Sequence, residues 1–263
     1  AVLVSRNGNW TRAEALARAA IRDQPGNDFA LFVLATQMAS VGRMGEAADL
    51  LDRAVALAPT SPLLLFMRVQ DLWAAGRAED ADRAIRDAVE LFPSHFAIWF
   101  TRCYLLLYTG RADAALGMVL NRTDRPSGIP SQSFDELVPV LNAAMTRQPA
   151  QIDAAIRIQM AAAHRGAGYA ENAMQFAAFL GRVDAAYEIA AAYYLSRGFR
   201  VPDVRFTPEQ GGYTRMSDRR TSVLFLPSTA AMRRDPRFDA LVTELGLTRY
   251  WQEAGVQPDY RRA

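Results

Sequence analysis

The chain has 263 residues, of which 51% are apolar and 22% are charged, a balance that argues against disorder and allows a sizeable core. Its formal net charge of +2 gives no bulk reason to expect direct nucleic-acid binding, and no apolar run approaches the roughly 18 residues of a membrane span, so we expect no membrane insertion. All 30 cationic side chains are arginines, and the single cysteine, Cys103, excludes an internal disulfide framework.

A repeat of 34 residues organises the first half of the chain. Its markers are two series with constant spacing: Gly8, Gly42, Gly76 and Gly110, and Pro25, Pro59 and Pro93. A glycine in the left-handed conformation ends one helix, an acidic residue soon after it suits the start of the next, and the proline then stops that second helix. The sequence therefore predicts a series of helical hairpins.

Apolar residues at helical spacing predict the core of these hairpins. In the first complete repeat they are Leu31, Leu34, Ala35, Met38, Ala47, Leu50, Leu51, Ala54, Val55 and Leu57. In the next two they are Leu65, Val69, Leu72, Ala81, Ile85 and Ala88, then Trp99, Cys103, Leu106, Ala115 and Val119. After a loop at 123–133, further helices are expected over 134–145, 152–164, 169–180 and 183–196.

The period and these positions resemble the tetratricopeptide repeat. The resemblance implies an all-α fold, a right-handed α-α superhelix in which a solenoid of hairpins spans 1–197. We expect residues 198–263 to form an extended connector and short capping helices that pack on the solenoid. Extended backwards, the register places Ala1 inside a first helix, with Val2 to Val4 at its end, so we expect the chain to be cut from a longer protein.

The C-terminal segment carries a second resemblance. Its residues are Arg233-Arg234-Asp235-Pro236-Arg237-Phe238, Gly246-Leu247-Thr248-Arg249-Tyr250-Trp251 and Pro258-Asp259-Tyr260. This phrase resembles the closing stretch of bacterial tetratricopeptide proteins whose repeats follow a winged-helix transcriptional activator or a class III adenylate cyclase. The resemblance implies the C-terminal interaction or sensory part of a bacterial regulator. Such a part is expected in the cytoplasm, or in the periplasm if a membrane helix precedes it.

No residue pattern indicates catalysis. His95 and His164 lie too far apart for a local metal motif, and each sits near an expected helix end, where a structural role is favoured. Cys103 occupies a small core position, which favours a buried, inert thiol. We therefore expect a non-enzymatic protein without a metal or cofactor.

The candidate site is a surface. The inward positions that the resemblance implies are Phe29, Phe32, Thr36, Leu63, Phe66, Gln70, Trp73, Ala97, Phe100, Tyr104 and Tyr108. A concave groove lined by so many aromatic residues favours an apolar or amphipathic segment of a protein or peptide partner. Two alternatives remain open: the chain's own Phe225, Phe238, Tyr250 and Trp251 fill the groove, or a small ligand binds there. A homodimer is also possible.

Overall fold

The computed structural model describes residues 9–262, which are helical apart from connecting segments and one isolated bridge between Val204 and Tyr213. These residues confirm the all-α, tetratricopeptide-like solenoid of helical hairpins. They form two compact units. Unit 1 comprises 9–101, 220–227 and 236–262, and unit 2 comprises 102–219 and 228–235. The C-terminal segment therefore contributes residues to both units.

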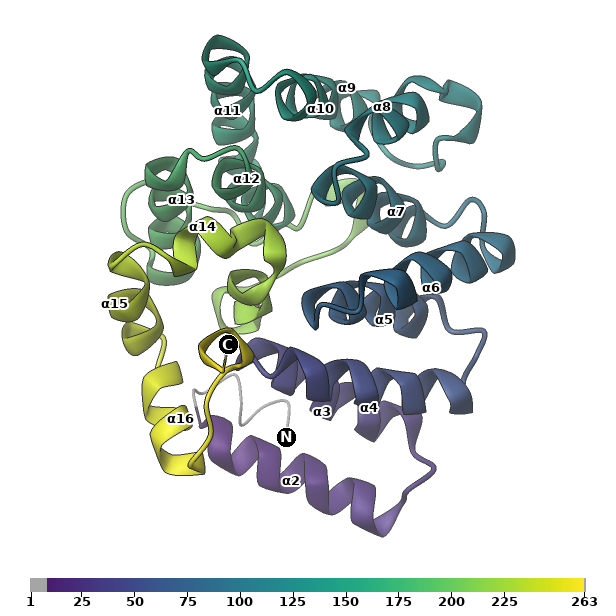
Figure 1. Ribbon diagram of the computed structural model, residues 1–263, viewed down its shortest axis with the longest axis vertical. Helices are drawn as coiled ribbons and strands as arrows, with labels where there is room; N and C mark the ends of the chain where they lie inside the picture. The colour runs from purple at the N-terminus through teal and green to yellow at the C-terminus, as the bar shows by residue number, and fades with distance from the viewer. Residues whose placement is uncertain (1–8, 263) are drawn as a thin grey trace. The chain divides into compact units, whose positions relative to one another are not determined.

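Unit 1 contains one helix followed by helical hairpins (Figure 1). Its repeat helices are α2 (Trp10–Asp23), α3 (Asp28–Ser40), α4 (Met44–Leu57), α5 (Pro62–Ala74), α6 (Ala78–Leu91) and the first part of α7 (Phe96–Tyr108), which ends in unit 2. Its C-terminal elements are η4 (Thr221–Phe225), α15 (Arg237–Glu244), α16 (Leu247–Ala254) and η6 (Asp259–Arg261).

The turn inside each hairpin follows from its glycine. Gly42 has a φ of 79°, a left-handed conformation that is costly for a residue with a Cβ, and Gly76 repeats it at 80°. The turn lets the Arg43 N–H donate to the Met38 carbonyl over 2.9 Å, which satisfies a carbonyl at the end of α3. The following helix carries Glu46 in its first turn, as expected.

The prolines end the second helices as predicted, since α2, α4 and α6 each stop two residues before Pro25, Pro59 or Pro93. The expected core positions are buried with three exceptions, which are Leu106 on α7 and Val55 and Leu57 at the end of α4. The other expected positions are at most 6% exposed. The prediction was wrong for Leu57, which is 49% exposed, and Val55 is half-buried. Leu57 is the last residue of α4 and lies where the helix runs out into the turn.

The first hairpin is described only through its second helix, α2. Leu16 is 43% exposed, whereas Leu50, at the same position of the next repeat, is 5% exposed. Ala20 is likewise exposed, whereas its equivalent Ala54 is fully buried. The part of α2 near its C-terminal end therefore has less cover than the matching part of α4. Gly8 and the expected helix end at Val2 to Val4 lie outside the described residues.

Unit 2 continues the helical pattern with the second part of α7. Its other elements are α8 (Ala112–Leu120), η1 (Arg122–Asp124), α9 (Ser131–Asp135), α10 (Leu137–Thr146), α11 (Pro149–Ala163), α12 (Ala167–Phe179), α13 (Val183–Leu195), η2 (Pro208–Gln210), η3 (Met216–Asp218) and α14 (Ala230–Arg233). η5 (Pro227–Thr229) begins in unit 1 and ends in unit 2. The four later helices predicted from the sequence are confirmed. The break between α9 and α10 has a local cause, because Pro139 has no N–H to donate to the Asp135 carbonyl.

The connector of unit 2 runs against the start of α12. The N–H groups of Ala167 and Gly168 donate to the carbonyls of Val204 and Arg205 over 2.8 and 2.7 Å. A Cβ on Gly168 would lie 2.8 Å from the Arg205 carbonyl oxygen, so only glycine permits this approach. Arg205 also pairs with the buried Glu171 at 2.8 Å, which ties the connector to α12 through side chains as well.

Candidate functional site

Seven of the predicted site residues lie on the first helices of the hairpins in unit 1. We call them the aromatic face: Phe29, Phe32 and Thr36 on α3, Phe66, Gln70 and Trp73 on α5, and Phe100 on α7. The rings of Phe29 and Phe32 lie 6.1 Å apart. Phe66, Gln70, Trp73 and Phe100 are each half-buried. The face therefore combines aromatic contact area with partial solvent access.

The helices that carry the aromatic face are most open where they begin. Phe29 at the start of α3 is 65% exposed, and Leu63, one repeat later, is 44% exposed. Phe96, the first residue of α7, is 50% exposed. Burying such side chains against a partner releases about 25 cal/mol per Å² of apolar surface. Exposed apolar side chains that form a contiguous patch are typical of an interaction surface.

Tyr104 and Tyr108, the last two predicted site residues, belong to unit 2. Their rings lie 6.4 Å apart and pack against α12, where Phe176 is 5.7 Å from Tyr104 and Phe179 is 5.0 Å from Tyr108. Asn172 also donates a hydrogen bond to the Tyr104 hydroxyl over 3.0 Å. Burial raises the pKa of both phenols. In unit 2 the chain's own α12 therefore contacts these positions.

The C-terminal end of α3 and the middle of α5 are covered within unit 1. Thr221 donates to the carbonyl of Ser40 on α3, and the preceding Arg220 places Nη1 3.7 Å from Met67 Sδ on α5. Two consecutive residues thus reach both helices, which shows that α3 and α5 run close together here. Residues 220–225, which we call the cover segment, thus reach from the end of α3 to the middle of α5.

Asp71 is a buried carboxylic acid on α5. It is 4% exposed, and its Oδ2 has no hydrogen-bond partner. Burial raises its pKa to about 8, although the nearby cation of Arg220 acts in the opposite direction. One repeat earlier, Gln37 occupies the same position and donates a hydrogen bond to the Trp10 carbonyl over 2.6 Å. An uncharged polar side chain therefore suits this position of the repeat.

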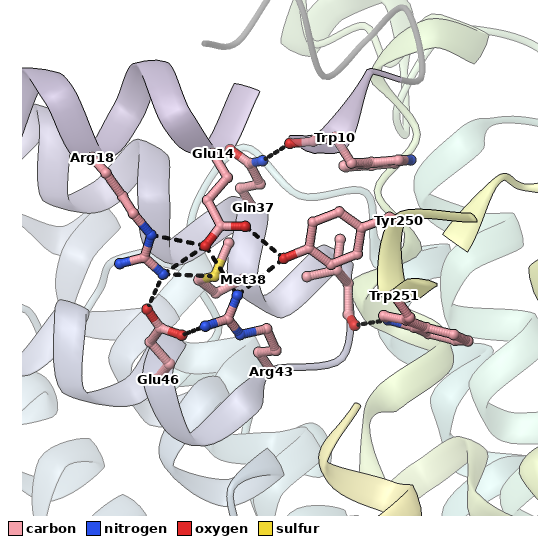
Figure 2. Close-up of polar contacts among 10 residues, drawn as sticks. Trp10, Glu14, Arg18, Gln37, Met38, Arg43, Glu46, Tyr250 and Trp251 are labelled. Carbon is pink, nitrogen blue, oxygen red and sulfur yellow. Dashed lines mark hydrogen bonds and ion pairs between the residues drawn. The ribbon is translucent and has the colours of Figure 1, made fainter. Parts of the chain in front are cut away.

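A buried polar network joins the C-terminal segment to the first repeats (Figure 2). The Tyr250 hydroxyl donates to Glu14 Oε2 over 2.7 Å and accepts from Arg43 Nη1 over 3.0 Å. Burial alone would raise the pKa of Glu14, but hydrogen bonds from Tyr250 and Arg18 and the charges of Arg43 and Arg18 outweigh it and hold the pKa below its usual value. Glu46 closes the network by pairing with both arginines. The arrangement satisfies a buried carboxylate and fixes α16 to α2.

The same segment binds the backbone of the turn between α3 and α4. Trp251 donates its indole N–H to the Val41 carbonyl over 2.9 Å. The Asp259 N–H donates to the Gly42 carbonyl over 2.8 Å, and its carboxylate accepts from the Gly45 N–H over 2.9 Å. The tail aromatics also pack together, for instance with 6.3 Å between the rings of Phe225 and Trp251. Sequence reasoning expected C-terminal helices that pack on the solenoid, but it did not identify the turn between α3 and α4 as the place where the tail binds.

The cysteine and the two histidines, which could in principle act in chemistry, are buried or stacked on aromatic rings. Cys103 is buried, and burial raises its pKa to about 12, so the thiol stays protonated. His95 stacks on Phe96 and His164 on Phe199, with ring centroids 5.1 and 4.1 Å apart. Between residues 9 and 262, no three histidine, cysteine or carboxylate side chains gather as a metal site would require.

A shallow cavity in unit 2 has a volume of about 280 Å³. Its lining comprises Leu107, Gly110, Ala112, Asp113, Ala144, Met145, Arg147 and Phe179. Pockets for drug-sized ligands usually have about 300–1,000 Å³, so this one is at the small end. None of the helices within the described part of the chain combines the length and apolar character that crossing a bilayer demands.

Comparison with known proteins bears on the first half of the chain. The family model described as Tetratricopeptide repeat matches residues 2–62 and 66–128. The described residues of these stretches hold α2 to α8 and with them the aromatic face. A search among curated proteins finds no significant match. Repeats of this family generally mediate protein–protein interaction, and their stacked hairpins typically serve as a non-catalytic scaffold.

Proposed function

We propose that the chain binds a protein partner through the aromatic face of unit 1. The observation that carries the proposal is the exposure of Phe29, Leu63 and Phe96 at the open end of successive first helices. The charged residues of α3 and α5 are Asp28, Arg68 and Asp71. Arg68 pairs with Asp52 on α4 at 2.6 Å, and Asp71 is buried. The face therefore suits an apolar or amphipathic segment of the partner.

The test is a peptide selection followed by matched variants. Peptides are selected on the chain from a random library, and their affinities are measured by fluorescence anisotropy. Phe29→Ala removes a ring that is 65% exposed, so the fold should persist while affinity falls at least about tenfold. Leu120→Ala is the control, because Leu120 is 58% exposed but lies on α8 in unit 2. Equal losses in both variants, or none in either, would count against the aromatic face.

A second variant separates a binding role from a core role. Phe66 is half-buried, so Phe66→Ala tests both possibilities at once. Intact unfolding free energy with lost peptide binding supports the site, whereas a loss of several kcal/mol places the ring in the core. The rival function, sensing of a small ligand, predicts a thermal shift with a metabolite that Phe29→Ala abolishes.

We further propose that this module serves a longer bacterial regulatory protein in the cytoplasm. The C-terminal phrase around Arg237-Phe238 and Tyr250-Trp251 supports this role, because it resembles the closing stretch of such regulators. The residues that precede Ala1 in the parent gene test the idea directly. A winged-helix or cyclase domain there is the expected result, and an unrelated enzyme domain would refute it.

A further inference from the structure

The cover segment is a resident occupant at one end of the aromatic face. Thr221 is 4% exposed and bonds to Ser40 at the end of α3, while Arg220 is exposed and reaches Met67 on α5. Phe225 anchors the other end of the segment, because a Cβ on Gly42 would lie 3.0 Å from its ring. The segment thus presents a cation, a hydroxyl and then apolar side chains to the first two complete repeats.

The fit at this end of the face is incomplete. Oδ2 of Asp71 and Oγ1 of Thr36 are both buried without a hydrogen-bond partner. Thr36 lies one helical turn before Ser40, and Arg220 is the charged group that faces Asp71. A buried polar atom without a partner costs about 1–3 kcal/mol. The folded state with the cover segment in place is therefore less stable than it would be if donors reached these two atoms.

We infer that the cover segment is a displaceable mimic of the partner and that it competes with the partner for the C-terminal end of the aromatic face. The inference rests on the proposed function and adds the chemistry of the partner: a segment with a cationic or N–H donor followed by apolar side chains. Such a segment brings a donor to Asp71 and Thr36 and apolar surface to Phe66 and Trp73. A tethered competitor acts at an effective concentration on the order of millimolar, so it raises the partner concentration needed for binding.

The test uses a fluorescein-labelled peptide with the sequence of residues 220–225, Arg-Thr-Ser-Val-Leu-Phe, added to the whole chain. In Arg220→Ala/Thr221→Val the resident segment loses its polar contacts, so the labelled peptide should bind at least about tenfold more tightly than to the wild type. Phe66→Ala in that background should remove the gain. Arg215→Ala is the matched control, because Arg215 is an exposed arginine of the connector in unit 2.

The outcomes separate this inference from the proposed function. Equal binding of the labelled peptide to wild type and double variant, or no binding to either, overturns the inference. Peptides selected for the proposed function decide that proposal on their own: if they bind wild type and double variant equally, the face is a site without a competitor. Circular dichroism checks that the double variant is folded. If it is not, Arg220→Ala alone replaces it, because this variant keeps the buried Thr221 contact, and a smaller gain in affinity is expected.

Discussion

The buried carboxyl of Asp71 makes the stability of unit 1 depend on pH in a definite direction. Its pKa is raised from the ordinary value of 3.8 to about 8 because burial disfavours the ionised form. Between these two values the folded chain holds a proton that the unfolded chain has released. The contribution of Asp71 to stability therefore falls as pH rises from about 4 to about 8, and levels off above that.

The magnitude follows from the size of the shift. One proton gives a slope of about 1.4 kcal/mol per pH unit, and the span of about four units corresponds to about 5 kcal/mol. The substitution Asp71→Asn removes the titrating carboxyl group and keeps the size and shape of the side chain. Its amide can also donate a hydrogen bond, as the Gln37 amide does at the same position of the preceding repeat. The variant should match the wild type near pH 4, exceed its stability by about 1–2 kcal/mol at pH 5, and exceed it by several kcal/mol at pH 8.

The assay is urea unfolding followed by tryptophan fluorescence at pH 5, 6, 7 and 8. The informative quantity is the difference in unfolding free energy between variant and wild type, since contributions of other titrating groups cancel. Asp87→Asn is the control, because Asp87 is an exposed carboxylate on α6. A difference for Asp71→Asn that does not change with pH would refute the reasoning.

Three further predictions test the docking of the tail and the cysteine. Tyr250→Phe leaves Glu14 and Arg43 without a buried hydroxyl and should cost about 1–3 kcal/mol in urea unfolding, whereas Tyr213→Phe, at a 63% exposed ring, should cost nothing measurable. Gly42→Ala should destabilise more than Gly76→Ala: both have positive φ, but only at Gly42 does a Cβ lie 2.9 Å from Pro258, and a smaller effect at Gly42 in thermal unfolding would contradict the docking. The Cys103 thiol, with its pKa near 12, should resist alkylation at pH 8 until the chain is unfolded; fast reaction of the native chain with iodoacetamide would show that it is accessible.

The local sequence was sufficient for the hairpins. The 34-residue spacing of Gly42, Gly76 and Gly110 marks the turns, and apolar residues such as Leu34 and Leu51 mark the core. These features can be read because a hairpin is made by contacts within about one repeat: hydrogen bonds four residues apart, a left-handed glycine and two apolar stripes. The exposed Leu57 shows the limit, since the pattern gives the stripe but not where the neighbouring helix stops covering it.

Only the tertiary structure decided which partners those stripes and the tail would find. Tyr250 reaches Glu14 across 236 positions of sequence, and Tyr104 meets Asn172 across 68. The polarity of Asp71 gave no sign that it would be buried opposite Arg220. Periodicity records which side of a helix is apolar, but the choice among several apolar surfaces depends on chain path and shape complementarity. Those are properties of the folded molecule, and they determine which part of the aromatic face stays open.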